Sequence, residues 1–185
     1  MAVATGWMLS QPVAAADSSA NTGNDTALLE QMAKLAGDDA ASRKQVLFDL
    51  AKSGDSRLEA FLENYRGGSV YLWNGQIVVC TETEEDEDFN ELAPLTHPLP
   101  GEPVLGQDGK QAKPDILDLE DMSPDRAGRL ATRSAIFLLK LSSPDPEARL
   151  VAVKKSGTPP YNAEALPVLE VIAENAPDEK IQFTA

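Results

Sequence analysis

Two stretches in different halves of the chain have nearly the same pattern. DDAASRKQVLFDLAKSG occupies residues 38–54, and SSPDPEARLVAVKKSG occupies residues 142–157. In each stretch an Asp stands four residues before an Arg, and an apolar face then leads to Lys-Ser-Gly. These pairs are Asp39 with Arg43 and Asp145 with Arg149. Because Asp is a favoured residue at helix starts and Gly at helix ends, the repeat predicts two similarly built α-helices.

The aspartate carries most of the local signal in each copy. A side-chain cap at a helix start is worth ~1 kcal/mol, whereas an exposed Asp–Arg pair one turn apart contributes about 0.3–0.5 kcal/mol. We expect both interactions, with the cap mainly fixing where the helix begins. Downstream of each copy a further apolar stretch ends in Glu-Asn, at residues 63–64 and 174–175. A repeated helix-turn-helix unit is typical of an α-solenoid.

Apolar residues at helical spacing predict the remaining helices. One covers residues 26–36 and ends at Gly37, and another runs from Asp55 to Gly67 with four large apolar side chains on one face. A later helix begins with Ser123 as its N-cap and Pro124 in its first turn. Its inward face is expected to hold Ala127, Leu130, Ala131, Ser134, Phe137 or Leu138, and Leu141. Asn162 caps a last helix, whose inward residues are Leu166, Leu169, Ile172 and Ala173.

A different pattern separates the two helical regions. SVYLWNGQIVVC consists of two β-rich runs around Asn74-Gly75, a pair that tolerates the positive φ angles of a type I′ turn. It is followed by TETEEDEDFNE, which has seven carboxylates between residues 82 and 91. We expect this acidic run to be a solvated, mobile loop. The Pro- and Gly-rich segment after it is predicted to hold a second short strand pair around Gln107-Asp108-Gly109.

These patterns predict a mainly α fold of the α+β class. We divide it into a signal-like or disordered N-terminus (1–25, with a flexible polar linker at 17–25), a first helical unit (26–66), an insertion (67–122) and a second helical unit (123–185). The last three form one domain. The apolar start and Ala14-Ala15-Ala16 favour a signal peptide without its charged beginning, and a disordered Ala/Ser tail is the alternative. No stretch reaches the ~20 apolar residues of a membrane-spanning helix.

Composition narrows the function classes. The formal net charge of −14 disfavours binding to nucleic acid or to an anionic membrane surface. The chain lacks a nucleophile elbow, a phosphate-binding loop, a zinc pattern and a calcium-loop spacing in its acidic run. We therefore predict no enzyme activity and assign no catalytic, cofactor-binding or metal-binding residue, while the partner-binding residues stay unknown.

Four features of the sequence are candidate sites. Cys80 ends an apolar run and is predicted to be a buried, inert thiol rather than a nucleophile. His97 lies between prolines and is predicted to be an ordinary loop residue. The Ser-Gly pairs at 53–54 and 156–157 are helix ends. Trp73 is expected to pack against the helical layer, with contact to a partner as the alternative.

The PDPEAR pattern and the Gly-Asp turn resemble HEAT-like repeats. Four features in order resemble, more specifically, the N-terminal extracytoplasmic region of the urea ABC transporter permease subunit, of the branched-chain amino-acid permease family. Over about residues 26–176 they are a helical repeat ending LEAFLENY, the hairpin SVYLWNGQIVV, a GEPV segment, and a helix from Arg129 leading into SSPDPEAR. The membrane-spanning part of that family is missing from this sequence, and the acidic run is longer and more charged than expected. The resemblance therefore implies a divergent, detached or truncated version.

The resemblance implies a periplasmic accessory domain with a structural or docking role in urea or amide transport. Its parent protein would lie in the membrane, and its partners would be a solute-binding protein and other transporter subunits. A freestanding, exported HEAT-like scaffold for protein interactions is the alternative. The two hypotheses share one expectation, namely that HEAT-like antiparallel helical repeats flank an inserted β-hairpin region.

Overall fold

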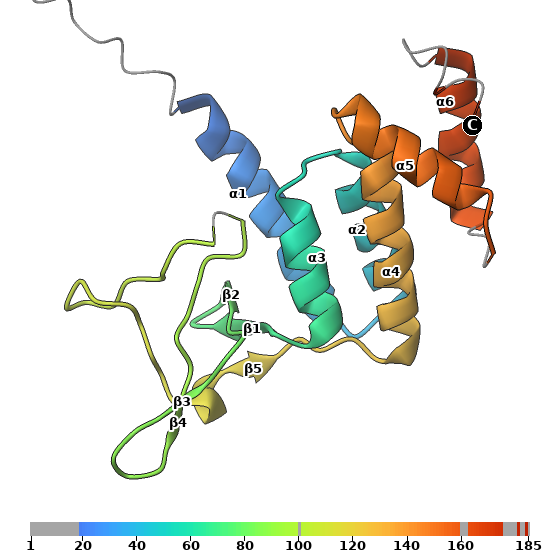
Figure 1. Ribbon diagram of the computed structural model, residues 1–185. Helices are drawn as coiled ribbons and strands as arrows, with labels where there is room; N and C mark the ends of the chain where they lie inside the picture. Colours follow the sequence, from blue (N-terminus) through green and yellow to red (C-terminus); the bar gives the residue numbers. More distant parts are fainter. Residues whose placement is uncertain (1–18, 100, 160–162, 176–180, 182–183, 185) are drawn as a thin grey trace, which may run out of the picture.

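A computed structural model describes residues 19–99, 101–159, 163–175, 181 and 184. In this part of the chain the fold is α+β, with helices on one side and small antiparallel sheets on the other (Figure 1). The predicted leader at residues 1–16 and the predicted cap Asn162 lie outside the described residues.

The helical layer is assembled from both halves of the chain. Its α-helices are α1 (Ser19–Ala33), α2 (Ala40–Lys52), α3 (Leu58–Gly67), α4 (Arg126–Leu141), α5 (Pro146–Ser156) and α6 (Leu166–Asn175), with 3-10 turns η1 (Lys34–Ala36) and η3 (Ala163–Ala165). Helix α4 packs against α2 and α3, while α5 packs against α4. Their buried apolar side chains belong to one core cluster, so the two halves share a core.

The two similar stretches begin helices α2 and α5 in the same way. Asp39 Oδ2 accepts a hydrogen bond from Ser42 N at 2.7 Å, and Asp145 Oδ1 accepts one from Glu147 N at 3.0 Å. Both caps are therefore confirmed. The expected Asp–Arg ion pairs are wrong, because each Arg reaches back to a carbonyl in the preceding turn. Arg43 Nη1 donates to Gly37 O at 2.9 Å and Arg149 Nη1 to Ser143 O at 2.6 Å.

Helix α4 begins in the same manner, which was not predicted from the sequence. Asp125 caps this helix by accepting a hydrogen bond from Gly128 N at 2.6 Å, so the prediction of Ser123 as the cap is wrong. Arg129 follows four residues later, and its Nε donates to Pro124 O at 3.2 Å. The helix begins no earlier because the chain before Ser123 is still part of the sheet, where Met122 N donates to Val70 O.

The buried face of α4 agrees with the predicted one only in part, at Leu138 and Leu141. The structure buries Thr132, Ala135, Ile136, Leu138, Leu139 and Leu141, while Leu130 is 59% exposed. Ala127, which was also predicted to face inward, is exposed. A helix with neighbours on more than one side buries a wider set of positions than a single stripe, and here α2, α3 and α5 decide which positions they are.

The first and last helices also depart from the predictions. Helix α1 begins at Ser19, so residues 19–25 are helical and not a linker. Extending a helix is much easier than starting one, which lets the polar residues join the apolar turns after them. In α6, Ile172 is buried as predicted, whereas Leu166 is 58% exposed and Ala173 is exposed.

The predicted hairpin is confirmed. Strand β1 (Val70–Trp73) pairs antiparallel with β2 (Gln76–Val79), and the turn residues Asn74 and Gly75 have φ of 51° and 75°, as a type I′ turn requires. A short strand β5 (Glu120–Asp121), which follows the 3-10 turn η2 (Ile116–Asp118), pairs with the other edge of β1. The insertion thus begins and ends on neighbouring strands.

Both faces of this sheet are covered. Val70, Leu72, Ile77 and Val79 face the helical core, while Tyr71, Trp73, Val78 and Cys80 face a second apolar cluster with Ala93, Leu95, Val104 and Ala112. Trp73 therefore packs against the irregular segment of the insertion, and the prediction that it packs against the helices is wrong. Side chains along a strand point alternately to its two faces, so the sequence could not show which face the helices cover and which face the irregular segment covers. The packing of these two neighbours decides it.

The second predicted strand pair is reduced to a turn with one bridge. Leu105 pairs antiparallel with Gln111, and Gly109 at the turn has a φ of 74°. The acidic run is exposed to solvent as predicted, but its conformation differs from the prediction. Strands β3 (Glu84–Glu85) and β4 (Glu91–Leu92) pair antiparallel, so the run is a short hairpin and not an irregular loop.

The α2–α3 turn contacts the end of α4 through Gly54. This residue has a φ of 69°, and a Cβ atom there would lie 2.7 Å from Ser142 O. We predict that Gly54→Ala lowers the free energy of unfolding by about 2–4 kcal/mol, because it adds left-handed strain and a clash with backbone. Urea denaturation measures the change.

Gly75→Ala is the matched control. Gly75 has a φ of 75°, and a Cβ atom on this residue would meet nothing within 4 Å, so only the strain of about 1–2 kcal/mol applies. Equal losses for the two variants would show that the contact with Ser142 does not constrain the fold.

Candidate functional site

A groove follows α4 and α5 on the side where α3 lies. Its main hollow has a volume of about 660 Å³ and is lined by residues of these three helices and of the segment after α5. A smaller hollow of about 360 Å³ reaches the α2–α3 turn. Lys140, Ala148 and Val151 line both hollows, so the two are continuous. We call this feature the basic groove.

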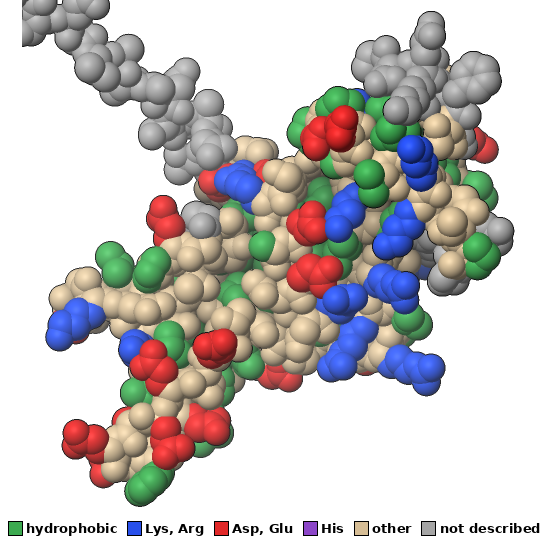
Figure 2. Space-filling model, in the orientation of Figure 1, with side chains coloured by type: hydrophobic (Ala, Val, Ile, Leu, Met, Phe, Trp, Pro, Cys, Tyr) green, Lys and Arg blue, Asp and Glu red, His purple; other side chains and the backbone are tan. Residues whose placement is uncertain are grey.

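The main hollow of the basic groove has a charge opposite to that of the whole chain, whereas the smaller hollow is also lined by Glu59 and Glu147. The main hollow is lined by Arg66, Arg133, Lys140 and Lys155, with Glu63 as the acidic residue, although the net charge of the chain is −14. Figure 2 shows Lys and Arg side chains gathered over the side of the molecule formed by α3, α4 and α5, and Asp and Glu side chains gathered on the β3–β4 hairpin. The acidic hairpin thus lies away from the side where the cations gather.

The four cations of the main hollow differ in their partners. Arg66 Nη2 lies 2.6 Å from Glu63 Oε2, and Lys140 Nζ lies 2.8 Å from Glu59 Oε1. Arg133 and Lys155 form no ion pair with any residue that the structure describes. The main hollow therefore offers two positive charges for an acidic ligand.

Exposed apolar side chains lie beside these cations. Leu130 is 59% exposed, Val151 is 66% exposed, and Phe137 is half-buried, all three lining the main hollow. An apolar patch rimmed by charge is typical of a protein interaction site.

The sequence contained a signal for this site that we missed. Basic and apolar residues alternate along α4 at spacings of four and three, so that they share one face of the helix. They are Arg126, Leu130, Arg133, Phe137 and Lys140. Because Leu130 and Phe137 also fit a core stripe, the predicted inward face included them, and only the packing of α4 separates the two interpretations.

The acidic run forms a projecting hairpin, which we call the acidic arm (residues 82–92). Its turn is held by Asp86, whose Oδ1 accepts hydrogen bonds from Asp88 N and Asn90 N, both at 2.9 Å. Hydrogen bonds from the side chain and backbone of Asn90 hold the pKa of Asp86 below its ordinary value. Phe89 lies in this turn with its side chain 81% exposed.

The remaining candidate residues from the sequence, Cys80, His97 and the two Ser-Gly pairs, lie at a strand end, in a loop and at helix ends. Cys80 is buried as predicted, and burial raises the pKa of its thiol, whose Sγ donates to Glu82 O. His97 is exposed in a loop, with its backbone N donating to Glu102 O. The hydroxyl groups of Ser53 and Ser156 donate to carbonyls three residues earlier, at helix ends. Within the described ranges, no three His, Cys, Asp or Glu side chains are grouped to hold a metal ion.

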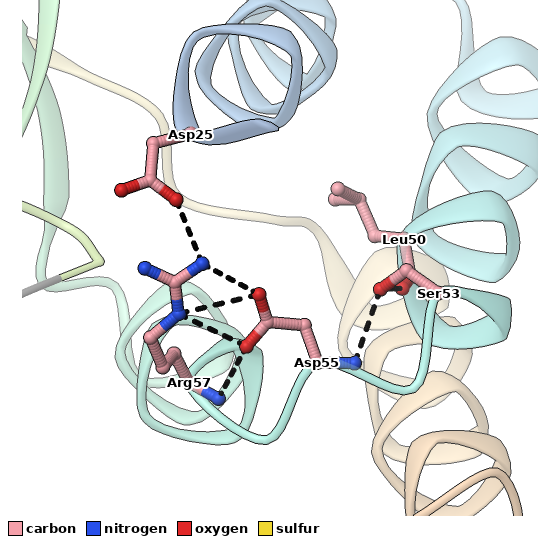
Figure 3. A network of polar contacts seen from close by, with 5 residues as sticks. All are labelled: Asp25, Leu50, Ser53, Asp55 and Arg57. Carbon is pink, nitrogen blue, oxygen red and sulfur yellow. Dashed lines mark hydrogen bonds and ion pairs between the residues drawn. The ribbon is translucent and has the colours of Figure 1, made fainter. Parts of the chain in front are cut away.

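A polar network around Arg57 lies outside the groove (Figure 3). Arg57 Nη2 donates to Asp25 Oδ1 and to Asp55 Oδ2, both at 2.7 Å, and Arg57 Nε also bonds the Asp55 carboxylate. The hydrogen bond from Arg57 lowers the pKa of Asp55, and the two carboxylates raise the pKa of Arg57. These contacts tie α1 to the α2–α3 turn, which gives the network a structural role.

Comparison with protein-family models, with curated proteins and with solved structures finds no match to this chain. Of the helices that the structure describes, none combines the length and the apolar character needed to cross a bilayer. The functional interpretation therefore rests on the basic groove and the acidic arm.

The Asp55–Arg57 pair predicts a pH-dependent stability. Asp55→Asn should lower the free energy of unfolding at pH 7 by about 1–2 kcal/mol, because a charge-assisted hydrogen bond is lost. The pKa of Asp55 in the folded chain lies below the ordinary value of 3.8. Its stabilising contribution is therefore present above that value and is lost as the pH falls through the folded-state pKa.

Urea denaturation of both proteins between about pH 7 and about pH 2 measures the effect, and the difference between them should shrink toward the acidic end. Asp49→Asn is the control, because Asp49 is exposed and lies 3.7 Å from Lys52 in a surface pair. A wild-type-to-variant difference that is the same at every pH would contradict the role of the Asp55 charge.

Proposed function

We propose that this chain is a protein-docking domain whose basic groove binds an acidic segment of a partner protein. One observation supports this function most directly. Arg133 and Lys155, without ion-pair partners among the described residues, lie beside the exposed apolar side chains of Leu130 and Val151 in the same hollow.

The chemistry of the hollow selects the kind of segment. Apolar side chains of the partner would cover Leu130 and Val151, and a fully buried Leu or Val contributes roughly 1.5–3 kcal/mol. Carboxylates of the partner would meet Arg133 and Lys155 at the rim, where charges chiefly set the orientation and the rate of association. A long polyanion such as a nucleic acid is disfavoured, because the chain as a whole carries a net charge of −14.

The sequence resemblance supports a setting for this docking domain. We place it beside a urea-type ABC permease in the periplasm, with a solute-binding protein or another transporter subunit as the source of the acidic segment. Helices α2 and α5 both begin with an Asp cap, which supports two HEAT-like units, one in each half of the chain. A freestanding, exported scaffold would use the same groove with another protein.

A binding experiment tests the groove directly. The probe is a short synthetic peptide in which Glu residues surround two Leu side chains, labelled for fluorescence anisotropy. We predict binding with a Kd of about 10–100 μM, and at least tenfold weaker binding to Arg133→Glu/Lys155→Glu, which reverses the two charges of the hollow that have no described partner. The same peptide with Lys in place of Glu should not displace the acidic peptide from the groove.

The matched control is Lys34→Glu/Lys110→Glu, which makes the same change of net charge at exposed residues outside the groove. Equal binding by the two double variants would place the peptide elsewhere. No binding of the acidic peptide to the wild type at about 1 mM would end the docking proposal. A Kd of that size corresponds to a binding free energy of about −4 kcal/mol.

A further inference from the structure

We infer that the acidic arm of a second copy of this chain docks in the basic groove, so that self-association competes with a partner protein. The inference rests on the proposed function of the groove and names one of its occupants. It follows from three observations: the charge of the arm, the exposed side chain at its tip and the positions of arm and groove on the molecule.

The arm has the chemistry that the groove is expected to bind. Seven carboxylates lie between residues 82 and 91. Among the described residues, Lys113 is the cation that pairs with one of them, through a contact of 2.6 Å from its Nζ to Glu84 Oε2. Phe89 is 81% exposed within this negative charge. An aromatic anchor surrounded by carboxylates matches the apolar, cationic hollow at Leu130, Val151, Arg133 and Lys155.

The arm is preorganised for insertion. Asp86 accepts hydrogen bonds from Asp88 N, Asn90 N and Asn90 Nδ2, which closes the turn and fixes the backbone at its tip. Pairing of β3 with β4 fixes its base. A segment that is already ordered loses less conformational entropy when it binds, so more of its contact energy appears as affinity. The exposed Phe89 side chain contributes little to the core of its own chain.

The contact must join two molecules. The arm projects from the sheet side of the fold, whereas α4 and α5 form the opposite side (Figure 1). An arm therefore meets the groove of another copy. The resulting pair still has one free groove, on the copy whose arm is inserted, and one free arm, on the copy whose groove is filled. Such a heterologous contact builds rings or open chains rather than a two-fold dimer.

The shared negative charge of the copies limits this association but does not prevent it. At 0.15 M salt the Debye length is about 8 Å, so repulsion between the two bodies is largely screened. The contacts inside the groove act over shorter distances and are screened less. We therefore expect weak, reversible self-association, which a partner with a better-fitting acidic segment displaces.

Complementation between two variants tests the inference. The arm variant, Glu85→Lys/Glu87→Lys/Phe89→Ala, has an intact groove, and the groove variant, Arg133→Glu/Lys155→Glu, has an intact arm. We expect the average mass of the wild type in sedimentation equilibrium to rise with concentration up to about 0.5 mM, and each variant alone to associate at least tenfold more weakly. An equimolar mixture of the two variants should form a one-to-one complex, because one productive arm–groove contact remains.

Phe89→Ala alone provides a second test, and this variant should fold normally because the Phe89 side chain is exposed. We expect this variant to self-associate at least tenfold more weakly, with an unchanged far-UV circular dichroism spectrum. A wild type that stays monomeric, variants that associate like the wild type, or a mixture without complex would each overturn the inference. If the synthetic acidic peptide still binds the groove in that case, the docking function stands. If the peptide fails as well, both proposals fall.

Discussion

The pairing of β1 with β5 is the constraint on which the rest of the fold depends. Tyr71 and Leu72 pair with Asp121 and Glu120, so the insertion leaves the helical layer after α3 and returns to it beside the same strand. The end of α3 and the start of α4 are thereby brought together, close enough that a Cβ on Gly68 would lie 2.8 Å from Ser123 Oγ. Helix α4 then packs between partners from the first half of the chain and α5 from the second. The basic groove exists because these three helices meet.

The same insertion separates the charges of the molecule. Its sheet covers the helical core with one face and a second apolar cluster with the other, and this second cluster supports the irregular segment from which the acidic arm projects. A dense group of carboxylates therefore lies on the arm at one side, while the cations of α3, α4 and α5 gather at the other, where Glu59 and Glu63 pair with two of them (Figure 2). A net charge of −14 alone would suggest a uniformly acidic surface. The arrangement supports an interaction protein with two surfaces of opposite chemistry.

Short-range signals were recognisable in the sequence, because the groups that satisfy them are only a few residues apart. Asp39 and Asp145 cap helices through backbone N–H groups two or three residues away, and Asn74-Gly75 turns the hairpin through its own φ angles. The prediction failed at Ser123, where a strand pairing with residue 70 delays the helix until Asp125. The prediction also failed at Arg43 and Arg149, whose guanidinium groups were expected to pair with the capping aspartates. They donate instead to backbone carbonyls in the turns before the helices.

For the candidate site, the sequence by itself determined the alternation of cations and apolar residues along α4, the acidic composition of residues 82–91 and the period-two pattern of β1 and β2. Only the tertiary structure decided that Leu130 is exposed while Ala135 and Leu139 are buried, that Trp73 faces away from the helices, and that the acidic run closes into an arm. The physical reason is common to all three. An amphipathic helix, a two-sided strand or a charged turn has more than one face that it can bury, and the choice is made by neighbours that are distant in the sequence.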